Sequence, residues 1–262
     1  MMRVLILTSS SRGTAARSIP VLAESAGIQI VSVIMASGTP ASHSRMRRRK
    51  IQKIRRIGLL GALNGIRIRP WFGGDPTESV ETICKRLELP FHLSSVLNSD
   101  RTVDLFREAE ADLGISLGNG YIPRRIFSVP RLGMINVHGE RLPEYQNAQS
   151  VIWPIYNLET VTGLSIHEVD DKIDTGRILY NEVYPIPFRA SLKGTVQAGA
   201  RVTSGKVPRA LRYVCENFEM LRARATPQSG GSSYTTPSFS AFLRMIRNNR
   251  KLYRRVQETI VQ

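Results

Sequence analysis

An asparagine and a histidine stand two residues apart in the apolar segment MINVH, at residues 134–138. In an extended strand, side chains two positions apart share one face of the sheet. Asn136 and His138 would therefore lie side by side at the strand's end. Asp174 occupies the tight acidic turn DDKIDTG at 170–176. An amide that donates hydrogen bonds, an imidazole that carries a proton and a carboxylate that accepts one are groups suited to acid–base chemistry.

A third segment, GNGYIP at 118–123, is rich in turn-forming residues and directly follows the buried run 113–117. In open α/β sheets, ligands bind beyond the carboxyl ends of the strands. Each of these three segments, taken singly, is more often structural than functional. Their positions at the ends of strands in one sheet predict that they form a common site.

The elements that would position these residues follow an α/β pattern. Residues 3–8, 14–26 and 28–35 are expected to form strand, helix and strand, which makes a βαβ unit in a mostly parallel sheet. The loop SSSRGT lacks both G-x-G-x-x-G and a Walker lysine, so it does not support a nucleotide site. Further strands are predicted at 90–93, 113–117, 133–138, 161–169 and 178–184, and further helices at 78–87, 101–109, 147–158, 191–220 and 239–261.

The net charge of +16 is unusually high for 262 residues and predicts an anionic partner. Nucleic acid, a phosphorylated small molecule and a membrane surface all satisfy this requirement. Between Arg45 and Arg56 there are eight basic residues and no acidic one. Residues 191–262 hold thirteen basic and three acidic residues. Pro185 and Pro187 mark the expected boundary between a catalytic domain at 1–189 and a basic, mainly helical extension at 190–262.

Other features bear on the compartment. No run of eighteen apolar residues is present, so no membrane span is expected. The N-terminal apolar run is too short for a signal peptide. The two cysteines are far apart and suit a reducing compartment, and no metal-ligand spacing appears. We therefore expect a cytoplasmic protein without a metal. A homodimer is compatible with the sequence.

The ordered motifs resemble the formyltransferases that use 10-formyltetrahydrofolate. That family carries Asn-x-His on a strand, then a Leu-Pro-x-Tyr loop, then an Asp-x-Gly turn after a second strand. This chain has INVH at 135–138, LPEY at 142–145, TGLSIHEVDDKIDTG at 162–176 and GYIP at 120–123. The resemblance is good over about residues 100–185. It implies a Rossmann-like formyltransferase fold.

The resemblance also implies roles for individual residues. Asn136, His138 and Asp174 would be catalytic, with 10-formyltetrahydrofolate as the formyl donor and no metal. A nearby Asp174 would raise the pKa of His138 and hold its charged form. His167 stands where the family often has a histidine, and it would only orient the loop. The implied folate-binding residues are Gly118, Gly120, Tyr121, Ile122, Val169, Asp170 and Asp171, and the implied acceptor-binding residues are Arg141, Tyr145 and Gln146.

Departures from the family pattern leave the amine acceptor open. After the histidine the family commonly has Pro-Ser-Leu-Leu-Pro, whereas this chain has GERLP at 139–143. Only 72 residues follow position 190, and they are expected to be helical rather than the β-barrel of enzymes that act on methionyl-tRNA. An amino sugar linked to a nucleotide is the favoured acceptor and charged initiator tRNA the alternative. A third hypothesis is a non-catalytic α/β protein that binds nucleic acid through its basic face.

Overall fold

The computed structural model describes residues 1–36, 43–72 and 77–261. Its centre is a seven-stranded sheet in which the first five strands in the spatial order run parallel, the sixth is antiparallel to the fifth and the seventh is antiparallel to the sixth. The mostly parallel sheet predicted from the βαβ pattern is therefore confirmed. The strand order is β3 (Phe91–Ser94), β2 (Ile28–Ala36), β1 (Met2–Thr8), β4 (Leu113–Leu117), β5 (Met134–His138), β7 (Val161–Glu168) and β8 (Ile178–Pro185).

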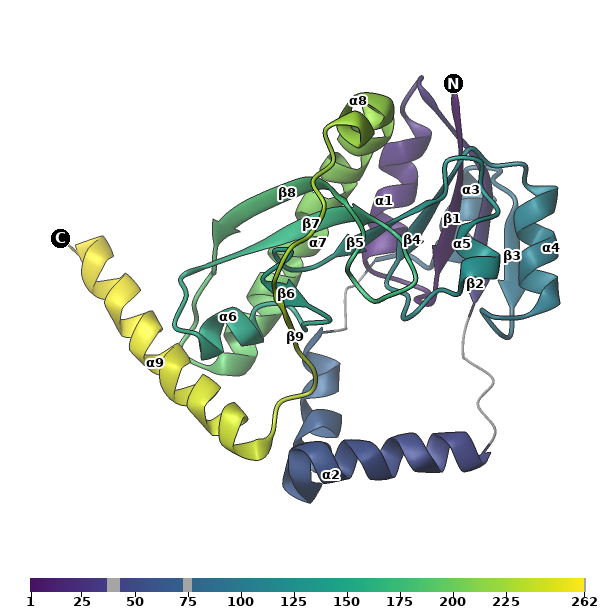
Figure 1. Ribbon diagram of the computed structural model, residues 1–262. Helices are drawn as coiled ribbons and strands as arrows, with labels where there is room; N and C mark the ends of the chain where they lie inside the picture. Colours follow the sequence, from purple (N-terminus) through teal and green to yellow (C-terminus); the bar gives the residue numbers. More distant parts are fainter. Residues whose placement is uncertain (37–42, 73–76, 262) are drawn as a thin grey trace.

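Helices cover both faces of this sheet (Figure 1). The first face packs Val4 and Ile6 of β1 against α1 (Thr14–Ala23), α3 (Val80–Arg86) and α7 (Leu192–Glu216). The second face packs Leu5 and Leu7 of β1 against α4 (Asp100–Glu108) and α5 (Arg124–Phe127). Both faces of β1 are buried, which explains why its sequence is continuously apolar instead of alternating.

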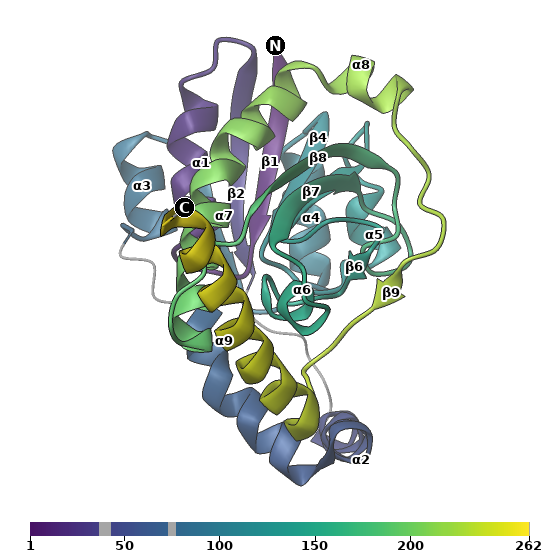
Figure 2. The same ribbon diagram turned by 90° about the vertical axis from the view of Figure 1, so that its left-hand side faces the viewer.

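A third apolar cluster lies beyond one end of the sheet. Here α9 (Phe239–Val261) packs Phe242, Met245 and Leu252 against α6 (Ile152–Tyr156) and the start of α7. The long helix α2 (His43–Ile68) and the 3₁₀ turn η1 (Arg69–Phe72) adjoin the same cluster. Figure 2 shows the later part of α2 beside α9, below the sheet.

The expected extension at 190–262 is helical, but α7 is part of the main core. Its residues Val207, Leu211 and Val214 belong to the same buried cluster as Val4 and Ile6. Packing is thus continuous across position 190. After α7 the chain forms α8 (Phe218–Ala223), then a strap at 224–238 that includes the short strand β9 (Ser232–Ser233).

One helix is much shorter than its periodicity predicts. The expected helix at 147–158 is observed only as α6, over Ile152–Tyr156. Residues 147–151 instead form a loop, in which Val151 has a φ of 71°. The buried carboxyl group of Glu140 accepts a hydrogen bond from the Val151 N–H, and this holds the backbone outside the helical region. A local apolar pattern does not reveal such a tertiary contact.

Candidate active site

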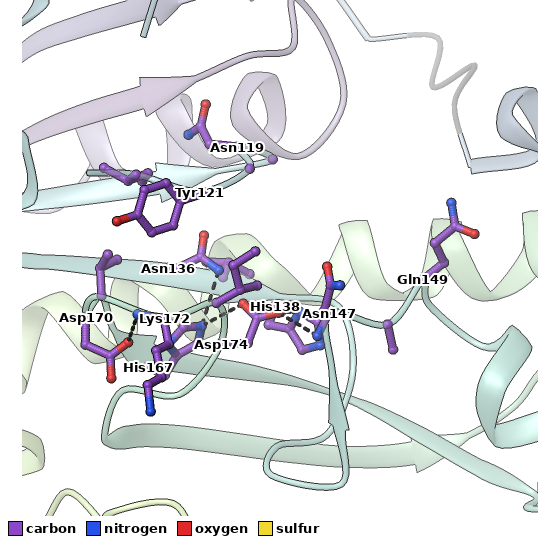
Figure 3. A pocket seen from close by; sticks show the side chains of 17 residues that line it. Asn119, Tyr121, Asn136, His138, Asn147, Gln149, His167, Asp170, Lys172 and Asp174 are labelled. Atoms are coloured by element: carbon purple, nitrogen blue, oxygen red, sulfur yellow. Dashed lines mark hydrogen bonds and ion pairs between the residues drawn. The ribbon is translucent and has the colours of Figure 1, made fainter. Parts of the chain in front are cut away.

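A pocket of about 290 Å³ opens where β4 and β5 end. The turn after β4 forms one wall, and the β7–β8 loop and the loop before α6 form the others (Figure 3). Its lining residues are Gly118, Asn119, Gly120, Tyr121, Ile122, Asn136, Val137, His138, Asn147, Ala148, Gln149, His167, Val169, Asp170, Lys172, Ile173 and Asp174.

Strand register brings Asn136 and His167 together. β5 and β7 are antiparallel, and Asn136 is the direct partner of His167. The Asn136 Nδ2 atom lies 3.2 Å from His167 Nε2. The other ring nitrogen, Nδ1, lies 2.7 Å from the Glu168 carbonyl oxygen and donates to it. This anchor turns Nε2 of the buried His167 toward Asn136 and Asp174.

The β7–β8 loop delivers Asp174 to the same place. Asp174 has a φ of 56°, a left-handed conformation that aspartate tolerates better than most residues. Two residues later, a Cβ at Gly176 would collide with the Glu168 carbonyl oxygen, so only glycine lets the loop fold back so closely onto the end of β7. The Asp-x-Gly pattern therefore has a steric cause.

The Asp174 carboxylate lies between two imidazoles. Its Oδ2 atom is 3.4 Å from Nδ1 of His138, and its Oδ1 atom is 3.4 Å from Nε2 of His167. The Asn147 N–H donates to Oδ2 at 2.8 Å. Burial by itself raises the pKa of Asp174, but the hydrogen bond with His167, the positive charges that His138 and His167 carry when protonated and the Asn147 N–H outweigh it and lower the pKa to about 2. The carboxylate is therefore ionised at neutral pH.

The environment of His138 differs from the sequence-based expectation. Its Nε2–H donates to the Tyr145 carbonyl oxygen at 2.7 Å, so its Nδ1 is the nitrogen that faces Asp174. The side chain is almost fully buried, and this burial lowers the pKa of His138 below its ordinary value, although Asp174 opposes the shift. His138 is therefore neutral at neutral pH, because burial outweighs the carboxylate that was expected to hold it charged.

The turn after β4 supplies the opposite wall. Gly118 has a φ of 72°, which bends the chain at the strand end. The Asn119 Nδ2 atom donates to the Leu7 carbonyl oxygen at 2.7 Å and ties this turn to β1. The Oδ1 atom of Asn119 is buried without a hydrogen-bond partner, and so is the Oε1 atom of Gln149. Both residues line the pocket, together with apolar Ile122 and Val169.

Four of the expected binding residues lie outside the pocket. Asp171 is exposed and paired with Arg124. Arg141 forms an ion pair with Glu159, and the Tyr145 hydroxyl donates to the same carboxylate at 2.6 Å. Tyr145 is buried, and Gln146 is bonded to Gln228 of the strap.

The remaining expected residues all line the pocket, and others join them. Asn119, Asn147, Gln149 and Lys172 line it without having been predicted. Asn119 lies inside the turn-rich GNGYIP segment, which the sequence already marked as part of the site. The sequence did not mark Asn147 and Gln149, because their segment has the periodicity of a helix. Among the described residues, no cluster of His, Cys, Asp and Glu could hold a metal ion.

The loop that carries Asn147 is held from two sides. On the inner side, the buried Glu140 carboxyl group accepts hydrogen bonds from the Val151 N–H and from the Thr162 hydroxyl of β7. On the outer side, the strap follows the loop: β9 pairs with β6 (Tyr145–Gln146), and the Asn147 side chain donates to the Tyr234 carbonyl oxygen at 2.9 Å. The C-terminal segment thereby supports the wall of the pocket.

Comparison with known proteins agrees with this geometry. The formyl transferase family profile matches residues 2–211. The chain is 37% identical to methionyl-tRNA formyltransferase of Nostoc sp. over 86 residues, which make up 32% of this chain and 25% of that protein. The alignment thus spans only a quarter of that relative's length.

Two solved structures share the fold at low identity. Glycinamide ribonucleotide transformylase 1 from Symbiobacterium toebii is 12% identical, with a TM-score of 0.57 over 87% of this chain and 95% of that one. The N-formyltransferase from Helicobacter canadensis, solved with folinic acid and dTDP-3-aminofucose, is 15% identical, with a TM-score of 0.55 over 97% of this chain and 81% of that one.

These matches define a protein with the α/β formyltransferase fold, and they confirm the resemblance that the motifs indicated. Because the family profile covers most of the sequence, the chain belongs to the formyl transferase family.

Proposed function

We propose that this protein transfers a formyl group from 10-formyltetrahydrofolate to a primary amine, and that the amine belongs to an amino sugar linked to a nucleotide. The observation that carries the formyl transfer is the gathering of Asn136, His138 and Asp174 in one pocket at the carboxyl ends of parallel strands. Asn136 and His138 share β5, whereas Asp174 comes from the later β7–β8 loop, and nothing in the apolar core requires this carboxylate to meet the other two polar groups.

Asn136 is proposed to stabilise the charge that develops on the formyl oxygen. Its amide carries two N–H groups, and one of them faces His167 Nε2 at 3.2 Å. The other can donate to the oxygen of a formyl group bound in the pocket. A preorganised donor of this kind costs no reorganisation during the reaction and is worth most when water is excluded.

Asp174 and His138 are proposed to handle the proton that the attacking amine loses. The ionised Asp174 accepts it as the new C–N bond forms. Its Oδ2 atom lies 3.4 Å from Nδ1 of His138. Because Nδ1 is unprotonated in neutral His138, it can take the proton onward, and the resulting imidazolium faces a carboxylate. The bond between the formyl carbon and the donor nitrogen then breaks, and the proton taken from the amine is returned from His138 and Asp174 to that nitrogen, so that both residues regain their starting states.

The pocket residues fit a reduced folate. When bound, the folate supplies an activated formyl carbon. The backbone of 118–122 and the side chains of Val169 and Asp170 line the pocket and offer both polar and apolar surface to such a ligand. Lys172, also in the lining, suits an anionic part of the same ligand.

The acceptor is proposed from charge and from structural likeness. A sugar nucleotide carries a diphosphate, which suits a chain of net charge +16. The Helicobacter canadensis enzyme, whose structure holds dTDP-3-aminofucose, has the same fold over 97% of this chain. The free, buried Cys84 and Cys215 suit a reducing compartment, so we propose that the reaction takes place in the cytoplasm.

Charged initiator tRNA is the second candidate acceptor. A specific observation favours it: the 37%-identical relative from Nostoc sp. is a methionyl-tRNA formyltransferase. The basic run Arg45–Arg56 would suit the phosphate backbone of a tRNA as well as the positive net charge suits the diphosphate of a sugar nucleotide.

A formyl-transfer assay separates the two acceptors. The purified protein and 10-formyltetrahydrofolate are incubated with dTDP- and UDP-linked amino sugars, or with charged initiator tRNA, and products are detected by mass spectrometry. We expect formylated amino sugar and no formylmethionyl-tRNA. Formylation of the tRNA alone would overturn the acceptor proposal, and no transfer to any amine would overturn the catalytic one.

A further inference from the structure

The later part of α2 exposes a continuous apolar stripe. Gly58 interrupts the helix with a φ of 75°, and the helix resumes after it. Leu59, Leu60, Leu63 and Ile66 are 62%, 60%, 55% and 72% exposed. With about 100° of rotation per residue, these four side chains fall within an arc of about 120°. They form one face of the helix and are not scattered around it.

The opposite face of this helix is firmly packed, so the stripe is not a misplaced core. Asn64 and Ile68 are buried. A Cβ at Gly61 would lie 3.2 Å from the Ser238 Cα atom, which shows how closely the helix approaches the start of α9. The helix is therefore held with its apolar stripe outward. Figures 1 and 2 both show α2 at the periphery, and in Figure 1 its first part crosses below the sheet.

Basic residues precede the stripe, in the part of α2 that lies before the kink at Gly58. The run Arg45–Arg56 contains eight basic residues and no acidic one. Of its basic side chains, Arg48, Arg55 and Arg56 lie within the described part, and all three are exposed. Ile51 and Ile54 are 41% and 40% exposed among them. A helix that combines dense positive charge with exposed aliphatic side chains is typical of segments that lie in a membrane interface.

We propose that α2 docks this protein on the surface of a lipid bilayer that contains anionic lipids. The aliphatic stripe would enter the boundary between headgroups and acyl chains, and the arginines would contact headgroup phosphates. The docking is peripheral, since no helix in the described ranges is long and apolar enough to cross a membrane. It occurs on the side of the molecule to which β1 and β2 direct their carboxyl ends (Figure 1).

Charge complementarity selects this partner over two others. A second copy of the chain would bring two basic runs together at a net charge of +16 each, and like charges oppose such a contact. A nucleic acid would use the arginines but would leave Leu59, Leu63 and Ile66 in water. An anionic bilayer satisfies both features of the helix. This proposal does not depend on formyl transfer, because docking is measured without substrates.

Vesicle co-sedimentation tests the proposal. The full-length protein is mixed with vesicles of phosphatidylcholine alone, or with about one-third phosphatidylglycerol, at about 0.15 M salt. The test variant is Leu59→Ser with Leu63→Ser. The matched control is Leu93→Ser, because Leu93 is also 62% exposed but lies on β3, away from α2. Thermal unfolding confirms that each variant is folded, and sedimentation equilibrium reports its oligomeric state.

We expect binding to the anionic vesicles only, unchanged in Leu93→Ser and weakened at least about tenfold in the double variant. Three results would overturn the proposal. The first is no binding of the wild type to anionic vesicles. The second is undiminished binding of the double variant, which would show that non-specific charge attraction alone, without the apolar stripe, causes the binding. The third is a wild-type dimer that the double variant dissociates, which would make the stripe a contact between copies.

Discussion

Asp174 holds its carboxylate between two imidazoles, 3.4 Å from each. This arrangement, and not the carboxylate alone, makes it suited to proton transfer. Asn147 positions it from the backbone, and His138 can take a proton from it. The roles of Asn136, His138 and Asp174 remain proposals that single substitutions can test.

Asp174→Asn removes the proposed base while keeping the size of the side chain. We expect turnover to fall by roughly two to four orders of magnitude, because an amide cannot accept the amine's proton. Binding of a stable folate analogue should persist. Asp171→Asn is the matched control, since Asp171 belongs to the same loop but lies outside the pocket, paired with Arg124. Equal turnover of the two variants in a steady-state assay would refute the assignment.

Asn136→Ala removes the proposed donor to the formyl oxygen. We expect kcat to fall by about two to three orders of magnitude with little change in thermal stability. The exposed Asn98 serves as the control position, with Asn98→Ala expected to be silent. A normal kcat for Asn136→Ala would show that the developing charge is stabilised by another group.

At the scale of single residues, strand periodicity correctly predicted which side chains of β5 share a face. Asn136 and His138 share a face because they are two apart on β5, and this holds whatever surrounds them. Arg141 and Tyr145 were expected in the pocket, yet they turn inward to Glu159. Their direction depends on a partner fourteen or more residues away in the sequence, which a local pattern does not show.

At the scale of elements, the loop at 147–151 decides the shape of the pocket. Its backbone departs from the predicted helix because Glu140 binds the Val151 N–H. The apolar residues of this segment do recur at helical spacing, but the hydrogen bond to the buried carboxyl group of Glu140 prevents its first residues from forming a helix. Strands were predicted more closely than this loop, since most of them are apolar runs bounded by turn residues, and β3 was displaced by only one residue.

Glu140 also predicts a pH dependence of stability. Burial raises its pKa from 4.5 to about 8, against the opposing effect of the Val151 and Thr162 hydrogen bonds. Below pH 4.5 the folded and unfolded chains both hold this proton, and the contribution of Glu140 to stability is greatest. As the pH rises toward about 8, the unfolded chain releases a proton that the folded chain keeps, so stability falls.

Glu140→Gln should remove this contribution. Relative to the variant, the wild type should lose up to about 1.4 kcal/mol of unfolding free energy for each pH unit inside that window. Chemical denaturation of both proteins at about pH 5 and about pH 7.5 measures the difference. A wild type and a variant with parallel pH profiles would contradict the buried, protonated state of Glu140.

At the scale of the whole molecule, the C-terminal third is not an appendage. α7 covers the sheet face that carries Val4 and Ile6, and the strap supports the pocket loop. Charge density changes near position 190, and this change suggested a domain boundary there. Charge reports only the surface of a helix, however, whereas the continuity of packing is set by its apolar side.

A chain that ends at residue 189 should therefore fail to fold. It would expose the apolar face that α7 covers, and we expect no cooperative thermal transition by circular dichroism. In the full-length protein, Leu211→Ala should cost about 2–5 kcal/mol of unfolding free energy, because Leu211 is completely buried. Cooperative unfolding of the 1–189 fragment, or a negligible effect of Leu211→Ala, would show that residues 1–189 form a separate domain, as the sequence suggested.

The central claim is that the pocket at the ends of β4 and β5 is a reduced-folate site. Isothermal titration calorimetry with 5-formyltetrahydrofolate, a stable analogue of the donor, tests it without knowledge of the acceptor. We predict saturable binding with a micromolar dissociation constant, retained in Asp174→Asn. The absence of binding by protein with a cooperative unfolding transition would contradict the account and leave the family fold without its folate chemistry.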